Sequence, residues 1–166
     1  MKVLLTLGLL FYVSGCVELD VLQQTGLIAP NIRATSGEPE IEEIETNGNG
    51  VHVVGNHGGG RIIDVEAERQ RLLNWGGPVR IEGYCNSACV ILTTLPNACL
   101  ESDATIGFHS SNINFGPVGN SQIAKYLRGG VLEKFLAEWQ YVPYTEIHHI
   151  WGRRYVALDP ETNLCS

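Results

Sequence analysis

A serine, a histidine and a glycine-rich loop have residue types and an order that could support acyl-transfer chemistry. Ser87 lies in the run GYCNSAC at 83–89, His109 follows it, and the loop NHGGG at 56–60 precedes it. A serine hydroxyl is a weak nucleophile until a base takes its proton, and an imidazole is the usual base near neutral pH. Backbone N–H groups can stabilise the oxyanion that forms when the hydroxyl attacks a carbonyl. The three features together indicate a serine hydrolase.

Ser87 lies where a predicted strand, 79–84, gives way to a predicted buried helix, 87–95. A serine at such a turn, flanked by small residues, has the geometry of a nucleophile elbow. The N–H of the next residue, Ala88, can then donate to an oxyanion. The alternative is that Ser87 caps the helix, which is a common role for serine.

The glycine loop follows a predicted strand, 51–54, and precedes a predicted helix, 63–75. Its glycines allow a sharp turn that directs N–H groups at a ligand, and the helix N-terminus adds a positive dipole. The loop suits a phosphate or an oxyanion. A phosphate-binding P-loop would need Gly-Lys-Ser/Thr, which is absent, and a plain tight turn is the alternative.

His109 closes a short strand predicted at 104–108. A single histidine in this position is often structural. However, His109 offers the base that Ser87 needs to act as a nucleophile.

The order of Gly59, Ser87 and His109 resembles that of the Clp protease proteolytic subunit and its exported relatives in the crotonase-like superfamily. The likeness is greatest to exported members with a Cys-x-Ser-Ala-Cys turn, which residues 85–89 match. It covers 51–111 well, 122–166 loosely and 17–50 hardly at all. The loop departs from the family at Asn56-His57, where Ser-Pro is usual.

This resemblance implies roles for individual residues. Ser87 would be the nucleophile and His109 the general base. The N–H groups of Gly59 and Ala88 would form the oxyanion hole, with the glycine on either side of Gly59 as a register alternative. The implied reaction uses neither a metal nor a nucleotide cofactor.

The resemblance also implies an acidic residue that would orient the histidine, but it defines the position of this acid less clearly. Counting along the chain places the family's acid at Asp159, but the local pattern puts Arg153-Arg154 where that acid is expected. Glu146 is an alternative, and a Ser–His dyad without an acid is another.

An α/β-hydrolase is a competing interpretation, because HGGG at 57–60 resembles a lipase oxyanion motif. The nucleophile turn of that fold is Gly-x-Ser-x-Gly, whereas cysteines occupy both glycine positions here. Its histidine would lie near the C-terminus, where His148 and His149 could serve, but the chain is short for that fold.

The predicted elements alternate between strand and helix, which favours an α/β fold with a mostly parallel sheet, βαβ crossovers and flanking helices. The resemblance implies the Clp/crotonase-like version of that class. A further helix is predicted at 122–139 from apolar residues at helical spacing, with Gly129-Gly130 as a weak point.

The N-terminus has the pattern of an export signal at 1–15, since its apolar run is too short to span a bilayer as a mature helix. Val13-Ser14-Gly15-Cys16 resembles a bacterial lipobox, which predicts lipidation of Cys16 and a chain anchored in the cell envelope, facing the periplasm. An ordinary signal peptide, with export or secretion, and an apolar strand are alternatives. Residues 16–50 are poorly patterned and include an acidic loop, and 51–166 form the predicted hydrolase domain.

The remaining cysteines indicate two disulfides in an exported chain, with three possible pairings. A bridge from Cys85 to Cys89 would hold the backbone of Ser87. In the alternative pairing, either Cys85 or Cys89 is bonded to Cys99, and the remaining one of the two is bonded to Cys165. Free buried thiols are an alternative. Zinc is disfavoured because Cys-x-x-x-Cys is not the usual ligand spacing, so no metal site is expected.

Composition limits the classes of partner. With 44% hydrophobic and 17% charged residues, the chain is neither a disordered tail, a coiled coil nor a polytopic membrane protein. A net charge of -7 without a basic stripe makes nucleic acid an unfavourable binding partner. The family resemblance and the lipobox-like N-terminus together imply an envelope-anchored Clp-like peptidase with a peptide or protein substrate, as a possible homo-oligomer. The alternative is a non-catalytic lipoprotein that binds a peptide or protein partner on the same fold.

Overall fold

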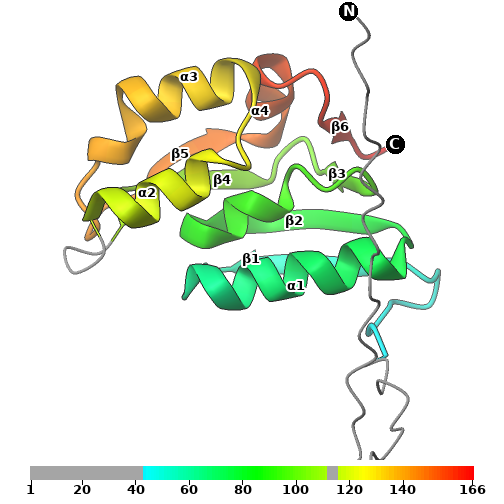
Figure 1. Cartoon of the computed structure of the whole chain (residues 1–166). Coiled ribbons are helices and arrows are strands. Elements are labelled where there is room, and N and C mark those ends of the chain that lie inside the picture. Colours follow the sequence, from blue (N-terminus) through cyan, green and yellow to red (C-terminus); the bar gives the residue numbers. More distant parts are fainter. Residues whose placement is uncertain (1–42, 112–115) are drawn as a thin grey trace, which may run out of the picture. The chain divides into compact units, whose positions relative to one another are not determined.

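A mixed sheet organises the chain in this computed structural model, which describes residues 43–111 and 116–166. Within those ranges the sheet has six strands, in the order β5-β4-β2-β3-β6, with β1 also paired to β2 (Figure 1). The strands are β1 (His52–His57), β2 (Val79–Asn86), β3 (Ala98–Leu100), β4 (Thr105–Phe108), β5 (His148–Trp151) and β6 (Asn163–Leu164).

The long strand β2 lies at the centre of the sheet. It pairs in parallel with β1, with β3 at its beginning and with β4 at its end, and β3 pairs in parallel with β6. Only the β4–β5 pair is antiparallel among the described strands. The predicted α/β class with a mostly parallel sheet is therefore confirmed, and the antiparallel edge makes the sheet mixed.

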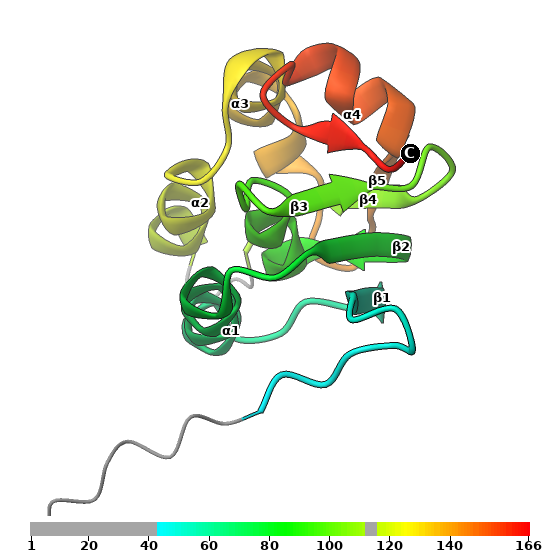
Figure 2. The ribbon, with the colours of Figure 1, turned by 90° about the vertical axis from the view of Figure 1, so that its right-hand side faces the viewer.

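Helices connect and cover these strands. They are α1 (Ile62–Trp75), η2 (Ser87–Leu92), α2 (Gly116–Ala124), α3 (Gly129–Ala137), η3 (Trp139–Tyr141) and α4 (Gly152–Leu158), where η marks a 3₁₀-helix. Figure 2 shows α1 and α2 on one side of the sheet. The helix predicted at 63–75 is confirmed. It ends at Trp75 and is capped by Gly76, whose backbone is left-handed and whose N–H donates to the Leu72 carbonyl.

The prediction of a single helix over 122–139 is wrong. Helix α2 ends at Ala124 and α3 begins at Gly129, which has a φ of 50°. A Cβ atom at Gly129 would lie 2.7 Å from the Leu158 carbonyl oxygen, so the end of α4 packs directly on this backbone. The glycine pair interrupts the helix because another segment needs that space.

The helix predicted over 87–95 is instead the short η2. The backbone then continues in tight turns, with Thr93 N–H bonded to the Val90 carbonyl and Leu95 N–H to the Leu92 carbonyl. These turns lead straight into β3. The short strands β3, β5 and β6 give no usable periodicity, and no strand is predicted at these positions from the sequence.

An aromatic cluster anchors the end of β4. The Phe108 ring stacks on Trp139, with ring centroids 4.6 Å apart, and also contacts Phe135 and Tyr155. All four side chains are buried. Because Phe108 directly precedes His109, this packing holds the backbone from which the histidine projects. In the described part of the chain, no helix is long and apolar enough to cross a membrane.

Candidate active site

The glycine loop, Ser87 and His109 follow the carboxyl ends of β1, β2 and β4. Residue His57 of β1 is in register with Cys85 of β2, and Asn86 of β2 is in register with Gly107 of β4. Ser87 therefore leaves the central strand with the glycine loop on one side and the end of β4 on the other. Parallel strands bring their carboxyl ends to one edge, where α/β proteins place their sites.

Ser87 has an unusual backbone conformation. Its φ is 57°, and among the described non-glycine residues only Asn56 also has a positive φ. Asparagine adopts this conformation readily, whereas a serine there stores strain of about 1–3 kcal/mol. The helix-capping alternative is wrong, because the N-cap of η2 is Asn86 and Ser87 is the first helical residue. A strained serine at a strand-to-helix turn is the arrangement of a nucleophile elbow.

Gly59 packs directly on the serine turn. A Cβ atom at Gly59 would lie 2.7 Å from the Ser87 Cβ and 2.9 Å from the Ala88 nitrogen, distances that no side chain could tolerate. The φ of Gly59, 88°, also requires glycine. The Ala88 N–H belongs to the first turn of η2, where no intrahelical acceptor exists. The structure thus brings the glycine loop and the serine turn together.

The Gly59 N–H is engaged by a side chain. It donates to Nδ1 of His57 at 2.9 Å, and Nε2 of His57 lies 3.4 Å from the carboxylate of Glu68 on α1. The hydrogen-bonding contact with Glu68, reinforced by its negative charge, raises the pKa of His57 above its ordinary value, although burial opposes the shift. Glu68 is not among the predicted site residues, since nothing local in the sequence links residue 68 to residue 57.

His109 is held in one tautomer by the backbone. Its Nδ1 lies 2.6 Å from the Ser110 carbonyl oxygen. A carbonyl only accepts, so Nδ1 must carry the hydrogen and Nε2 keeps its lone pair, as a general base requires. The Ser110 N–H in turn donates to the Val142 carbonyl at 2.7 Å. In the described chain no hydrogen bond joins His109 to Ser87.

The structure does not bring Asp159 to His109. The Asp159 carboxylate is buried at 1% exposure and accepts hydrogen bonds from Arg128 at 2.9 Å and Thr162 at 2.7 Å. Those contacts secure the C-terminal end of α4. Glu146 is exposed, and no hydrogen bond or ion pair joins it to His109 in the part of the chain that the structure describes. Among the described residues, the group that orients the His109 ring is therefore the Ser110 carbonyl and not a carboxylate.

The two C-terminal histidines have different surroundings. His148 stacks on Trp139, with ring centroids 5.2 Å apart. His149 lies opposite Gly107 on β5, and its Nε2 is 3.1 Å from the Asn86 side-chain oxygen. His149 therefore contacts the residue before Ser87. The antiparallel β4–β5 register that places it there has no local sequence signal.

The four cysteines that the structure describes form two disulfides, which confirms the predicted number of bridges. Cys85 joins Cys89, with Cα atoms 5.3 Å apart, and Cys99 joins Cys165, with Cα atoms 4.9 Å apart. The first bridge closes around Ser87 and is fully buried. The rival pairing through Cys99 is wrong. Disulfide sulfurs are not thiolate ligands, and no cluster of potential metal ligands occurs among the described residues.

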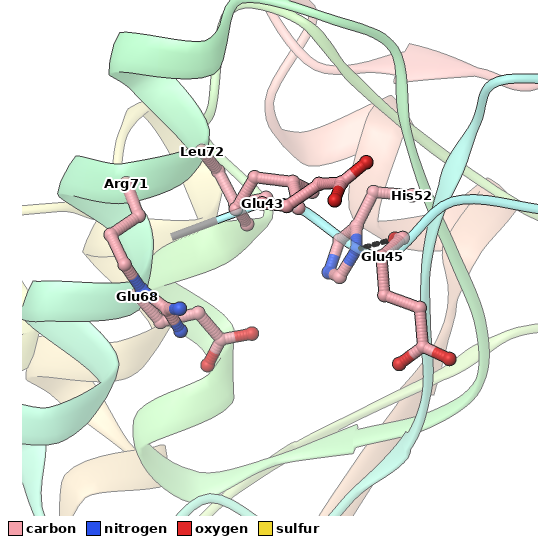
Figure 3. A pocket seen from close by; sticks show the side chains of 7 residues that line it. Glu43, Glu45, His52, Glu68, Arg71 and Leu72 are labelled. Carbon is pink, nitrogen blue, oxygen red and sulfur yellow. Dashed lines mark hydrogen bonds between the residues drawn. The ribbon is translucent and has the colours of Figure 1, made fainter. Parts of the chain in front are cut away.

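A pocket of about 240 Å³ lies away from Ser87, between α1 and the segment that leads to β1 (Figure 3). Figure 3 shows Glu68, Arg71 and Leu72 of α1 facing His52, Glu43 and Glu45. His52 is fixed there by its Nδ1, which lies 2.7 Å from the Glu45 carbonyl oxygen. Glu68 is shared, since the same side chain lines this pocket and contacts His57.

Comparisons with protein-family models, curated proteins and solved structures found no match. Cys16, the export signal and the acidic loop up to position 42 lie outside the described residues.

Proposed function

We propose that this chain is a Clp-like serine hydrolase of the peptidase class, with Ser87 as nucleophile and His109 as general base. The observation that carries the proposal is the strained backbone of Ser87 at a strand-to-helix turn, packed against Gly59. Backbone strain of this kind clusters at active sites, and a nucleophile elbow holds its serine on such a strained turn.

The chemistry follows from the arrangement. Ser87 Oγ attacks the carbonyl carbon of a peptide, and its proton passes to Nε2 of His109. The carbonyl π electrons move to oxygen, and N–H groups of Ala88 and the glycine loop stabilise the resulting charge. When the tetrahedral intermediate collapses, His109 gives the proton to the leaving amine. Water then attacks the acyl-enzyme by the same route and releases the carboxylic acid.

A second function is favoured by two observations. The Gly59 N–H is already bonded to His57, and no carboxylate contacts His109 in the described chain. A non-catalytic lipoprotein that binds a peptide or protein in the same place would tolerate both features. The two functions differ in whether Ser87 reacts covalently.

Covalent labelling distinguishes them. The purified mature chain is expected to react with a fluorophosphonate, because the activated hydroxyl attacks phosphorus as it would a carbonyl carbon. Peptide mapping by mass spectrometry should place the adduct on Ser87, and Ser87→Ala should lose it. Ser102→Ala, at an exposed serine, is the matched control and should label as the parent does. Equal labelling of the Ser87→Ala variant and the parent would show that this serine is not the nucleophile.

The proposal includes an envelope location. It is supported by the lipobox-like sequence at 13–16 and by two disulfides, which persist in oxidising compartments. A second chain or another membrane signal is needed for stable anchoring, since one acyl chain binds weakly.

After expression in a Gram-negative host, the N-terminal peptide is expected to begin at Cys16 and to carry lipid, as measured by mass spectrometry. The Cys16→Ala variant should carry none and should leave the membrane fraction. An unmodified Cys16, or a chain that still begins at Met1, would contradict lipidation.

A further inference from the structure

The amide of Gly59 has two possible acceptors, the imidazole of His57 and the oxyanion of a bound substrate. We propose that His57 is a positioning residue that controls the oxyanion hole. As a neutral imidazole it holds the Gly59 N–H, and as an imidazolium it releases that N–H to the substrate. This inference rests on the proposed hydrolase function.

The direction of the hydrogen bond supports the first of these two states, in which the neutral imidazole holds the Gly59 N–H. The Gly59 N–H donates to Nδ1 of His57 at 2.9 Å, so Nδ1 carries no hydrogen in this state. The hydrogen of the neutral ring is then on Nε2, directed at the Glu68 carboxylate 3.4 Å away. In this arrangement the Gly59 N–H is occupied and cannot stabilise an oxyanion at Ser87.

Protonation reverses that arrangement. A proton added to Nδ1 makes both ring nitrogens donors, so Nδ1–H and the Gly59 N–H face each other as two donors and the bond is lost. The loop has room to respond. Gly58 and Gly60 are exposed, and a Cβ atom at either would meet nothing within 4 Å, so the peptide groups beside Gly59 can rotate. Gly59 itself stays against Ser87 because its Cα packs there.

Glu68 is the charged side chain that favours the imidazolium of His57. Glu68 of α1 faces the ring, and Arg71, further along that helix, lines the pocket beside Glu68. From β2, the residue in register with His57 is Cys85, which is in a disulfide and does not titrate. The contact with Glu68 raises the pKa of His57. The released state is therefore present below this raised pKa and is lost as the pH rises through it.

The test is the pH profile of fluorophosphonate labelling, measured as a second-order rate constant for the parent and three variants. In the parent, the rate should fall by about 10²-fold as His57 loses its proton, the usual effect of losing one oxyanion-hole donor. His57→Ala should remove this fall and should exceed the parent at alkaline pH by the same factor. Glu68→Gln should move the fall to lower pH, because the carboxylate that favours the imidazolium is gone. Glu82→Gln, which removes an exposed charge beside β1, is the matched control and should keep the parent profile.

A spectroscopic measurement separates this inference from the hydrolase proposal. In the ¹⁵N-glycine-labelled Ser87→Ala chain, the Gly59 amide proton resonance should shift with pH at the midpoint of the His57 titration, and Glu68→Gln should lower that midpoint. Absence of labelling in every chain would reject the hydrolase function, and the amide titration would still decide whether His57 releases Gly59. An alkaline fall retained in His57→Ala, or a Gly59 amide that does not follow His57, would overturn the inference.

Discussion

His109→Ala is expected to slow acylation of Ser87 by about 10⁴-fold or more, the scale at which dismantled Ser–His pairs lose activity. The Ser110 carbonyl orients the His109 ring and places a ring hydrogen on Nδ1. In the proposed reaction, Nε2 takes the serine proton. Without the imidazole, the hydroxyl must lose its proton to water. The rate constant for fluorophosphonate labelling of the folded variant measures this loss.

His149→Ala is the matched control for that experiment. It removes an imidazole that also approaches the serine turn, through the Asn86 side chain at 3.1 Å. Because His149 contacts the neighbour of Ser87 and not Ser87 itself, we expect the rate to change by less than about tenfold, the cost of one neutral hydrogen bond. If His149→Ala abolished labelling while His109→Ala retained it, the base would be His149.

Asp159→Asn is expected to lower the free energy of unfolding by about 2–3 kcal/mol while leaving the folded protein reactive. The carboxylate is buried between Arg128 and Thr162, and breaking a buried ion pair costs about 3–5 kcal/mol. The lower figure is expected because the Arg128 side chain is one-third exposed and water can solvate it. Urea unfolding measures the stability, and labelling of the folded protein measures the reactivity.

Glu161→Gln controls for the loss of a charge beside Arg128. Its carboxylate lies 3.3 Å from the same guanidinium but is 74% exposed, so the change should be below about 1 kcal/mol. A catalytic acid at position 159 would give the opposite result, with labelling lost and stability retained. That outcome would identify Asp159 as a catalytic residue.

Much of the site follows from chain order alone. Strands β1, β2 and β4 and helix α1 have clear local patterns, and parallel strands bring their carboxyl ends to one edge. The residues that follow those strands, Gly59, Ser87 and His109, are therefore expected at one edge of an α/β sheet. That β2 lies between β1 and β4 is decided by the order of the strands in the sheet. The short spacing of Cys85 and Cys89 also made their bridge a local possibility, although it could not exclude the pairing with Cys99.

Other features depend on contacts between distant residues. The break between α2 and α3 arises because Leu158 approaches Gly129, and the burial of Asp159 arises because Arg128 reaches it. Counting along the chain could not find either contact, since each joins elements whose relative placement is set by packing.

The hydrogen bond to the Gly59 N–H also depends partly on local sequence and partly on contacts between distant residues. The sequence placed a histidine in the glycine loop, but its effect on the loop depends on which ring nitrogen faces Gly59 and which faces Glu68. Helical periodicity determines which face of α1 is apolar, yet it does not say which strand end that helix covers. Residue types and periodicity are local properties of the chain, whereas hydrogen-bond partners are chosen by the packing of elements that only tertiary structure brings together.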